Sequence, residues 1–238
     1  MESSSNKDIK HLEETVISPD LKKVNESLSE VVLDSFLDDG LFKDIPLVST
    51  VLGLYRTTQN YKKLRFVKKL HKVLFQLDEV PVEERNNFVK KLGIVEKEDL
   101  LRRILYLIDQ LDEVEKAEIV GKLLKSYLQG KIDRQDFLRL SVVVNKIYLD
   151  DLTYFNIQHS YTGEVSKEKR LQFLNDNENQ IHYSEESLVQ SGLLVKEVVE
   201  DQYEGKRREK LGGSGKGVFL KEKIKISSIG RILLNHGF

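Results

Sequence analysis

The sequence contains two concentrations of Lys and Arg, the residue types that bind anionic groups. The first lies between Ile45 and Leu77, where seven Lys or Arg and no Asp or Glu occur in a chain of almost neutral net charge. The second lies in residues 205–217, where five cations stand against a single acid, Glu209. Because such side chains bind phosphate and carboxylate groups, both stretches predict contact with an anionic surface or polymer. We expect the first stretch to use Lys62, Lys63, Arg65, Lys68 and Lys69, and the second to use Lys206, Arg207, Arg208, Lys210 and Lys216.

Three other patterns imitate catalytic or ligand-binding motifs but lack the residues that the chemistry needs. The stretch GGSGKG at 212–217 resembles a phosphate-binding loop, but that loop requires Gly and Ser or Thr where Lys210 and Gly217 stand. The stretch 130–137 resembles the second half of a calcium-binding loop, whose first three ligand positions would be Lys125, Tyr127 and Gln129. No metal-ligand spacing relates the histidines, which are His11, His71, His159, His182 and His236. With no Cys in the chain either, we predict a non-enzymatic protein without a metal or cofactor.

The stretch from Ile45 to Tyr55 is mostly apolar and contains Pro46, a residue favoured in the first turn of a helix. As a helix it would measure about 16 Å, whereas the hydrocarbon core of a bilayer measures about 30 Å. The stretch is therefore too short to span a membrane alone, although its composition suits insertion or packing against partner helices. We expect these contacts to involve Pro46, Leu47, Val48, Val51, Leu52 and Gly53.

The second half of this basic segment predicts an amphipathic helix. Apolar residues recur at helical spacing up to Leu77, with Lys and Arg on most of the remaining positions. This pattern is typical of a helix that lies on an anionic membrane surface or on an acidic partner. It equally fits a helix whose apolar face is the core of a bundle and whose lysines are solvated. Residues 1–44 carry eleven acids against five Lys, so they could neutralise the basic segment or mask it.

A mainly α protein is predicted to position these residues. Residues 1–17 are polar and charged, which predicts a mobile leader. Residues 18–156 repeat apolar residues at helical spacing and predict a helical bundle that includes the basic amphipathic segment 45–77. We expect five to seven helices with short connections, among them helices at 21–37, 81–92, 98–111, 113–129 and 134–155.

Composition bounds the class and the location of the protein. With 39% apolar and 32% charged residues, the chain is typical of globular rather than disordered proteins. Its first residues are polar and acidic and show no apolar core of a secretory signal. We therefore predict a cytoplasmic protein, peripheral at the inner face of the membrane where its basic segment engages lipid.

Residues 165–238 predict a small α+β module after the bundle. Helices are expected near 171–174, 184–191 and 227–236, with strands at 194–199 and 218–226. The sequences SLVQSGLL and IKISSIGRILL resemble the closing half of winged-helix proteins, which implies a winged-helix-like module. The helix that would enter the major groove, YSEESLVQS, offers no Arg or Lys to guanine edges. Such a module suits dimerisation or ligand sensing better than the recognition of bases.

The whole chain is similar to a group of uncharacterised bacterial proteins that join an "IP-apolar-G-apolar-basic" helical region to such a module. This resemblance implies a membrane-acting effector of antiphage defence. We therefore expect a non-enzymatic bacterial effector or scaffold that is regulated by assembly or by sensing an anionic ligand. Its expected partners are further copies of the chain, an anionic membrane surface, nucleic acid or a nucleotide, and a protein that the sequence does not identify. The alternatives are a DNA-binding winged-helix transcriptional regulator and a structural subunit of a larger assembly.

Overall fold

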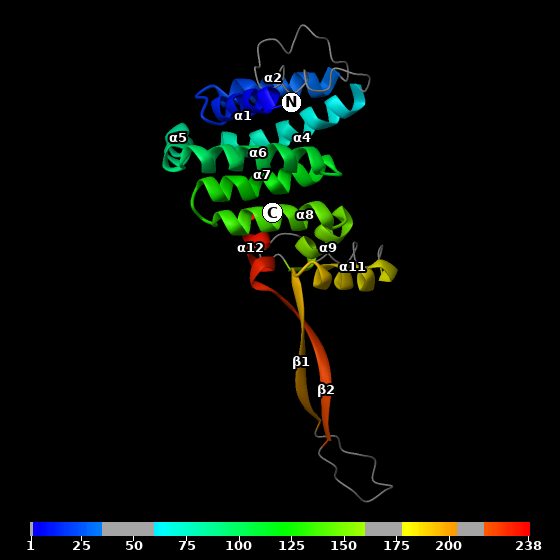
Figure 1. Cartoon of the computed structure of the whole chain (residues 1–238). Helices are drawn as coiled ribbons and strands as arrows, with labels where there is room; N and C mark the ends of the chain where they lie inside the picture. Colours follow the sequence, from blue (N-terminus) through cyan, green and yellow to red (C-terminus); the bar gives the residue numbers. More distant parts are fainter. Residues whose placement is uncertain (1, 35–59, 160–177, 204–216) are drawn as a thin grey trace, which may run out of the picture. The chain divides into compact units, whose positions relative to one another are not determined.

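The computed structural model describes residues 2–34, 60–159, 178–203 and 217–238 (Figure 1). Within these ranges the chain is mainly helical, with ten helices and one two-stranded sheet. The chain divides into two compact units. The helical unit contains Met1–Leu152 and Ile232–Phe238, and the hairpin unit contains Thr153–Arg231. The mainly α fold predicted from the sequence is confirmed.

The helical unit is built from helices joined by short connections. Local signals set several of their ends: Pro81 precedes α5, Asp133 caps α8 by accepting a hydrogen bond from the Asp136 N–H, and Gly130 follows α7 with a positive φ of 68°. The helices are α1 (Glu2–Val16), α2 (Leu21–Asp34), α4 (Asn60–Asp78), α5 (Val82–Lys91), α6 (Ile94–Gln110), α7 (Val114–Leu128), α8 (Arg134–Lys146) and α9 (Leu149–His159), the last of which continues into the hairpin unit.

Helix α4 forms the centre of the helical unit. It contacts α2, α6 and α7, and its apolar face is buried through Phe66, Val67, Leu70, Val73, Leu74 and Leu77. Gly121 of α7 permits a close approach, since a Cβ atom there would lie 2.8 Å from Gln76 Cγ and 3.0 Å from Val73 Cα. The second interpretation of the basic amphipathic pattern is therefore confirmed for residues 60–77: the apolar face is bundle core.

The predicted mobile leader is wrong, because residues 2–16 form helix α1. Ile9, Leu12 and Val16 are buried, and α1 contacts α6 and α2. An ion pair of 2.6 Å between Glu13 and Lys97 joins α1 to α6. Ser, Asn and charge dominate the composition of this segment, but three apolar residues at helical spacing suffice to attach it to the bundle.

The expected helix at 134–155 is also corrected, because the chain forms two helices there. Ile147 adopts extended backbone angles (φ −87°, ψ 145°) between α8 and α9, and the adjacent Tyr148 is 76% exposed. The sequence does not indicate this break, because Ile147 is itself a buried apolar residue and the helical spacing of apolar residues continues through it. The helices predicted near 21–37, 81–92, 98–111 and 113–129 correspond to α2, α5, α6 and α7.

The hairpin unit contains α11 (Glu178–Gln190), β1 (Leu194–Tyr203), β2 (Gly217–Ile226) and the start of α12 (Ser228–His236). The strands pair antiparallel over ten positions, from Leu194 opposite Ile226 to Tyr203 opposite Gly217. The order helix, strand, strand, helix agrees with the prediction. The winged-helix arrangement stays a prediction, because its expected first helix near 171–174 lies outside the described residues.

Ser227 links the hairpin to α12. Its hydroxyl accepts a hydrogen bond from the Gly230 N–H at 3.0 Å, which caps the helix, and donates one to the Gly192 carbonyl at 2.6 Å. The last seven residues, predicted as part of the C-terminal module, group with the helical unit instead. There the Lys122 ammonium donates to the Phe238 carbonyl at 3.0 Å, and His236 Nδ1 lies 3.2 Å from Ser126 Oγ.

Candidate functional site

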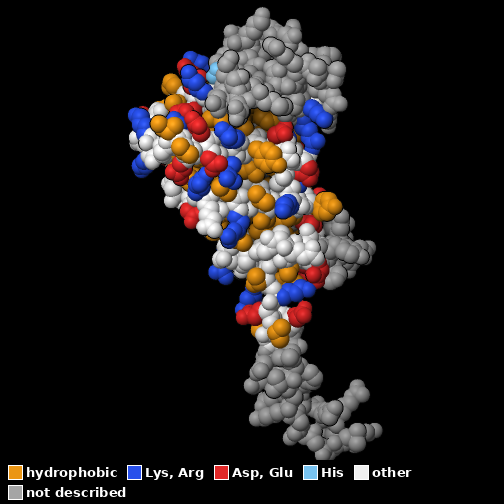
Figure 2. Space-filling model, viewed as in Figure 1, with side chains coloured by type: hydrophobic (Ala, Val, Ile, Leu, Met, Phe, Trp, Pro, Cys, Tyr) orange, Lys and Arg blue, Asp and Glu red, His pale blue; other side chains and the backbone are white. Residues whose placement is uncertain are grey.

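The described part of the predicted basic surface lies on α4. Lys62 is exposed, and Arg65 and Lys68 are half-buried, whereas the side chain of Lys63 lies outside the described residues. On the face of the molecule that Figure 2 shows, Lys and Arg are mixed with Asp and Glu over the helical unit rather than gathered on one side. Of the proposed anionic-surface residues, three therefore remain available to solvent on α4.

Lys69 has a different role from the predicted one, because it is buried in the bundle (3% exposed). Its ammonium donates to the carbonyls of Asp109 at 2.6 Å and Leu111 at 2.9 Å. These carbonyls lie at the end of α6, where the last backbone acceptors of a helix have no partner within it. Burial lowers the pKa of Lys69 to about 8. The prediction that Lys69 contacts an anionic surface is therefore wrong, since its ammonium binds the last carbonyls of α6.

The other predicted site residues lie outside the described part of the chain. These are the insertion or packing residues Pro46, Leu47, Val48, Val51, Leu52 and Gly53, and the phosphate-contact residues Lys206, Arg207, Arg208, Lys210 and Lys216. In the described residues no helix is long and apolar enough to cross a membrane. Within the same residues, no group of three or more His, Asp or Glu could hold a metal ion.

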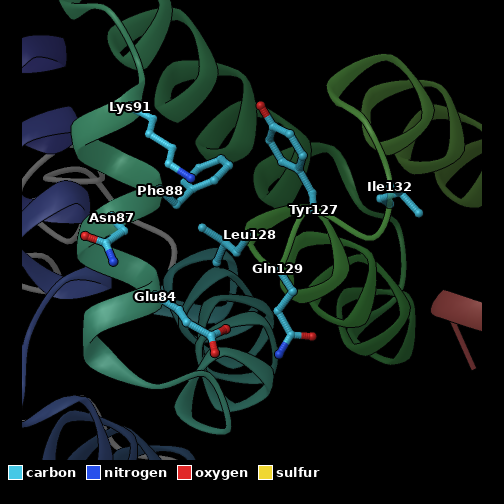
Figure 3. A pocket seen from close by; sticks show the side chains of 9 residues that line it. Glu84, Asn87, Phe88, Lys91, Tyr127, Leu128, Gln129 and Ile132 are labelled. Carbon is cyan, nitrogen blue, oxygen red and sulfur yellow. The ribbon is translucent and has the colours of Figure 1, made fainter.

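The helical unit contains a pocket of about 490 Å³ that sequence reasoning missed (Figure 3). One wall is α5, and the other is the end of α7 with the turn that leads to α8. Both walls lie in the same unit. The pocket is open to solvent and combines apolar with polar side chains. Its lining residues are Glu84, Asn87, Phe88, Lys91, Tyr127, Leu128, Gln129, Gly130 and Ile132.

The apolar part of the pocket is held by aromatic packing. Phe88 meets Tyr127 edge to face, with ring centroids 4.9 Å apart at 85°, and Tyr127 stacks on Phe137 at 5.5 Å and 10°. Phe137 is completely buried, so the stack connects the pocket wall to the core. Burial raises the pKa of the Tyr127 phenol. The aromatic wall is therefore neutral and fixed in position by the core behind it.

The polar part of the pocket comes mainly from one face of α5. Glu84, Asn87 and Lys91 are exposed and recur at helical spacing on the side that lines the pocket. Neither Glu84 nor Lys91 forms an ion pair with another described residue. Arg85 occupies the opposite, buried side, where its guanidinium donates to the carbonyls of Val80 and Ser18, each at 3.0 Å. The helix is thus held from one side and leaves charged groups unpaired on the other.

Gln129 supplies an acceptor that the fold does not use. Its Oε1 atom is buried and has no hydrogen-bond donor, although buried polar atoms are paired in the large majority of cases. In Figure 3 the side chains of Glu84 and Gln129 extend toward the same end of the pocket, and Lys91 lies toward the other. In that view the nitrogen of the Gln129 amide, rather than its oxygen, is turned toward Glu84.

The end of α7 adds a partial negative charge to that side. Gly130 and Lys131 close the helix by donating their N–H groups to the carbonyls of Tyr127 and Ser126, each at 2.9 Å, the pattern of a Schellman motif. The aligned peptide dipoles of a helix place about half a negative charge at its C-terminus. The same turn begins the stretch 130–137 that resembles the second half of a calcium-binding loop. In the sequence, Gly130 indicated the end of α7. The pocket itself was not indicated, because its other wall, α5, lies far away along the chain.

Comparison of this chain with protein families, with curated proteins and with solved structures finds no significant match.

Proposed function

We propose that this protein is a non-enzymatic scaffold that binds a segment of a partner protein in the pocket between α5 and the end of α7. The observation that carries the proposal is an open pocket with an aromatic wall, Phe88 and Tyr127, which the buried Phe137 holds in position. Such a wall offers a fixed apolar surface to a side chain of a partner.

The size and composition of the pocket support this choice. A volume of about 490 Å³ lies within the roughly 300–1,000 Å³ of ligand sites, and the pocket is open enough to admit a side chain presented by another polypeptide. Phe88 and Tyr127 provide the aromatic area that anchors residues at protein interfaces.

The test is selection of binders from a random peptide library displayed on phage, with the immobilised full chain as bait. We expect peptides that bind the wild-type chain and lose binding to Asn87→Trp, a substitution at an exposed position that fills the pocket with an indole ring. Tyr148→Ala, which removes an exposed aromatic residue elsewhere, is the matched control and should leave binding unchanged. If no peptide is enriched, or if Asn87→Trp binds every enriched peptide as well as the wild type does, the proposal is wrong.

We propose nucleic-acid binding through the hairpin unit as a second candidate function, which keeps the alternative of a winged-helix regulator. The charges on the strands are largely compensated: Lys225 pairs with Glu197, and Lys196 pairs with Glu186 at 2.5 Å. The connection between the strands carries Lys206, Arg207, Arg208, Lys210 and Lys216 against few acids. This contrast favours contact with phosphates by the connection rather than by the strands.

Titration of duplex DNA at several salt concentrations tests this second function. Binding that depends on phosphate contacts should weaken steeply with salt, and a Lys206/Arg207/Arg208/Lys210→Glu variant should lose it. A Lys223/Lys225→Glu variant, which reverses the charge of exposed residues on β2, should lose less. DNA binding that is absent at low salt, or equal in both variants, would exclude this function.

Membrane engagement through residues 45–77 and a role in antiphage defence stay predictions. For residues 60–77 such engagement requires partial opening of the bundle, because their apolar face is core. Anionic liposomes floated with the wild-type chain and with a Lys62/Lys63/Lys68→Glu variant test this prediction. Flotation that the variant loses would support it.

A further inference from the structure

We propose that the partner segment is an amphipathic helix that lies along α5 in the pocket, with a basic residue beside Glu84, an acidic residue beside Lys91 and an apolar residue between them. This inference rests on the proposed function and specifies the conformation and the charge pattern of the bound segment. Three observations carry it: the length of the pocket wall on α5, the opposite charges at its two ends, and the aromatic surface between them.

The pocket extends along two turns of α5. Glu84, Asn87, Phe88 and Lys91 all line it, at positions i, i+3, i+4 and i+7, which lie on one side of a helix. The seven residues from Glu84 to Lys91 cover about 10 Å along the helix axis. Figure 3 shows Glu84 toward one end of the pocket and Lys91 toward the other. The pocket is therefore a groove beside α5, and several residues of a bound segment can contact its wall.

The two ends of this groove carry opposite charges that the fold leaves unpaired. Neither Glu84 nor Lys91 forms an ion pair with another described residue, and both are exposed. The rings of Phe88 and Tyr127 supply the neutral part of the wall. A segment of uniform charge is attracted at one end and repelled at the other, whereas a segment with one base and one acid is attracted at both ends. The groove therefore selects a partner that carries both charges.

The spacing of these groups fits a helical segment better than an extended one. Helical residues seven apart lie on one side and about 10 Å apart along the axis, which equals the axial separation of Glu84 and Lys91. A residue four positions after the first lies midway on the same side and meets the aromatic wall. In an extended segment about three residues cover the same length, but side chains three apart point to opposite faces. An extended segment therefore presents only one of the two charges to the wall.

The groove is held in position before any partner binds. Tyr127 stacks on the buried Phe137, and α5 is attached from its other side, where Arg85 donates to the Val80 and Ser18 carbonyls. A preformed surface avoids the cost of ordering on binding. We expect the apolar contact to supply most of the affinity, because exposed ion pairs contribute little, and the end charges to determine which segments bind.

The first experiment uses the full chain and two fluorescent peptides of identical composition, each Ala-rich and about 15 residues long so that it forms a helix. Peptide A has Glu four residues before a central Leu and Arg three residues after it, so that all three lie on one side. Peptide B has the Arg two residues further along, which turns it to the other side of the helix but leaves it on the same face of an extended chain. Fluorescence anisotropy measures both affinities.

We expect peptide B to bind roughly 3-fold more weakly than peptide A, because one ion pair is lost. Equal binding of the two peptides would overturn the helical conformation.

A charge reversal at one end of the groove tests the charge pattern. Peptide C has Glu in place of the Arg of peptide A, and the wild type should bind it roughly 5-fold more weakly. Glu84→Lys makes both ends of the groove basic and should reverse this preference. Glu83→Lys makes the same change in the same turn of α5, at an exposed position that does not line the pocket, and should keep the preference for peptide A. If Glu84→Lys still prefers peptide A, or if both variants reverse the preference, the inference is wrong.

The library selection separates this inference from the proposed function. If library peptides bind in the pocket, as the loss in Asn87→Trp shows, but peptide A is preferred over neither B nor C, the scaffold function stands and the helical inference falls. If neither the library peptides nor peptide A bind the pocket, both fall. Library peptides that depend on the pocket, together with both expected preferences for peptide A, support both.

Discussion

Helices α4 and α5 use their charged residues in opposite ways. Helix α4 belongs to the most basic segment of the sequence, yet the fold pairs its inner cations: Lys69 donates to two carbonyls of the α6 end, and Lys72 pairs with Glu118 at 3.2 Å. Helix α5 is shorter and nearly neutral, yet Glu84 and Lys91 remain unpaired beside an open pocket. A charge that the fold has already paired is structural, and a charge that it leaves unpaired is available to a ligand.

The same contrast occurs between neighbours within α5. Arg85 is 3% exposed and bound to backbone carbonyls, whereas Glu84 is exposed at the pocket. Their positions differ by one residue, which turns the side chain by about 100° around the helix axis. The direction of a side chain, more than the number of charges in a stretch, therefore decides whether a residue supports the fold or a site.

The largest expected effect separates the core of α4 from the exposed surface near α5. Leu70→Ala should lower the free energy of unfolding by about 2–5 kcal/mol, because it removes buried methyl groups and leaves a cavity. Val95→Ala should change it by less than about 0.5 kcal/mol, since Val95 is 82% exposed. Urea denaturation followed by circular dichroism measures both. Similar losses in the two variants would contradict the placement of Leu70 in the core and of Val95, at the start of α6, on the surface.

Arg85→Met tests the buried side of α5, with a somewhat smaller expected change in the free energy of unfolding. The substitution keeps most of the apolar stem but deprives the carbonyls of Val80, Val16 and Ser18 of a charged donor. We expect a loss of roughly 3 kcal/mol in the free energy of unfolding. Arg102→Met on α6, where the side chain is exposed, is the control and should be nearly neutral. A loss of less than about 1 kcal/mol for Arg85→Met would contradict the proposed attachment of α5 to the end of α1.

Lys69 predicts a dependence of stability on pH. Its pKa in the folded chain is lowered from 10.5 to about 8 by burial, so between pH 8 and pH 10.5 the unfolded chain binds the proton more strongly. The contribution of Lys69 to stability is therefore lowest below pH 8 and rises as the pH increases to 10.5. The difference in unfolding free energy between wild type and Lys69→Met should rise over this range. A flat profile would contradict the lowered pKa of Lys69.

Local sequence signals were sufficient for most of the helical unit. The apolar spacing and the Pro, Gly and acidic residues at helix ends indicated α2, α5, α6 and α7 because these signals act within a few residues. They failed for α1, whose few apolar residues gain their stability from contact with α6, and for the break at Ile147. Both outcomes depend on tertiary contacts that local spacing does not contain.

The pocket could not be predicted for the same reason. Glu84 and Gln129 are 45 residues apart in the sequence, and no local pattern relates them. The charge of the basic segment also gave a wrong prediction for Lys69, because the carbonyls that receive its ammonium lie 40 and 42 residues further along the chain. A residue type shows what chemistry is available, but only the fold shows whether a neighbour has already used it.

The smallest expected change in stability comes from two neighbouring acids of α5, and it tests most directly whether the two faces of this helix differ in role. Glu84→Gln and Glu83→Gln each remove one exposed acid from the first turn of α5, where an acid interacts favourably with the helix dipole by about 0.3–1 kcal/mol. Their effects on the unfolding free energy of the free chain should thus be small and nearly equal. The two variants should differ only when a peptide selected for the pocket is bound, because Glu84, unlike Glu83, lines the pocket. Thermal unfolding with and without that peptide measures both quantities in one series. If Glu84→Gln destabilises the free chain by more than about 1 kcal/mol relative to Glu83→Gln, then Glu84 supports the fold as Arg85 does, and the contrast between the two faces of α5 fails.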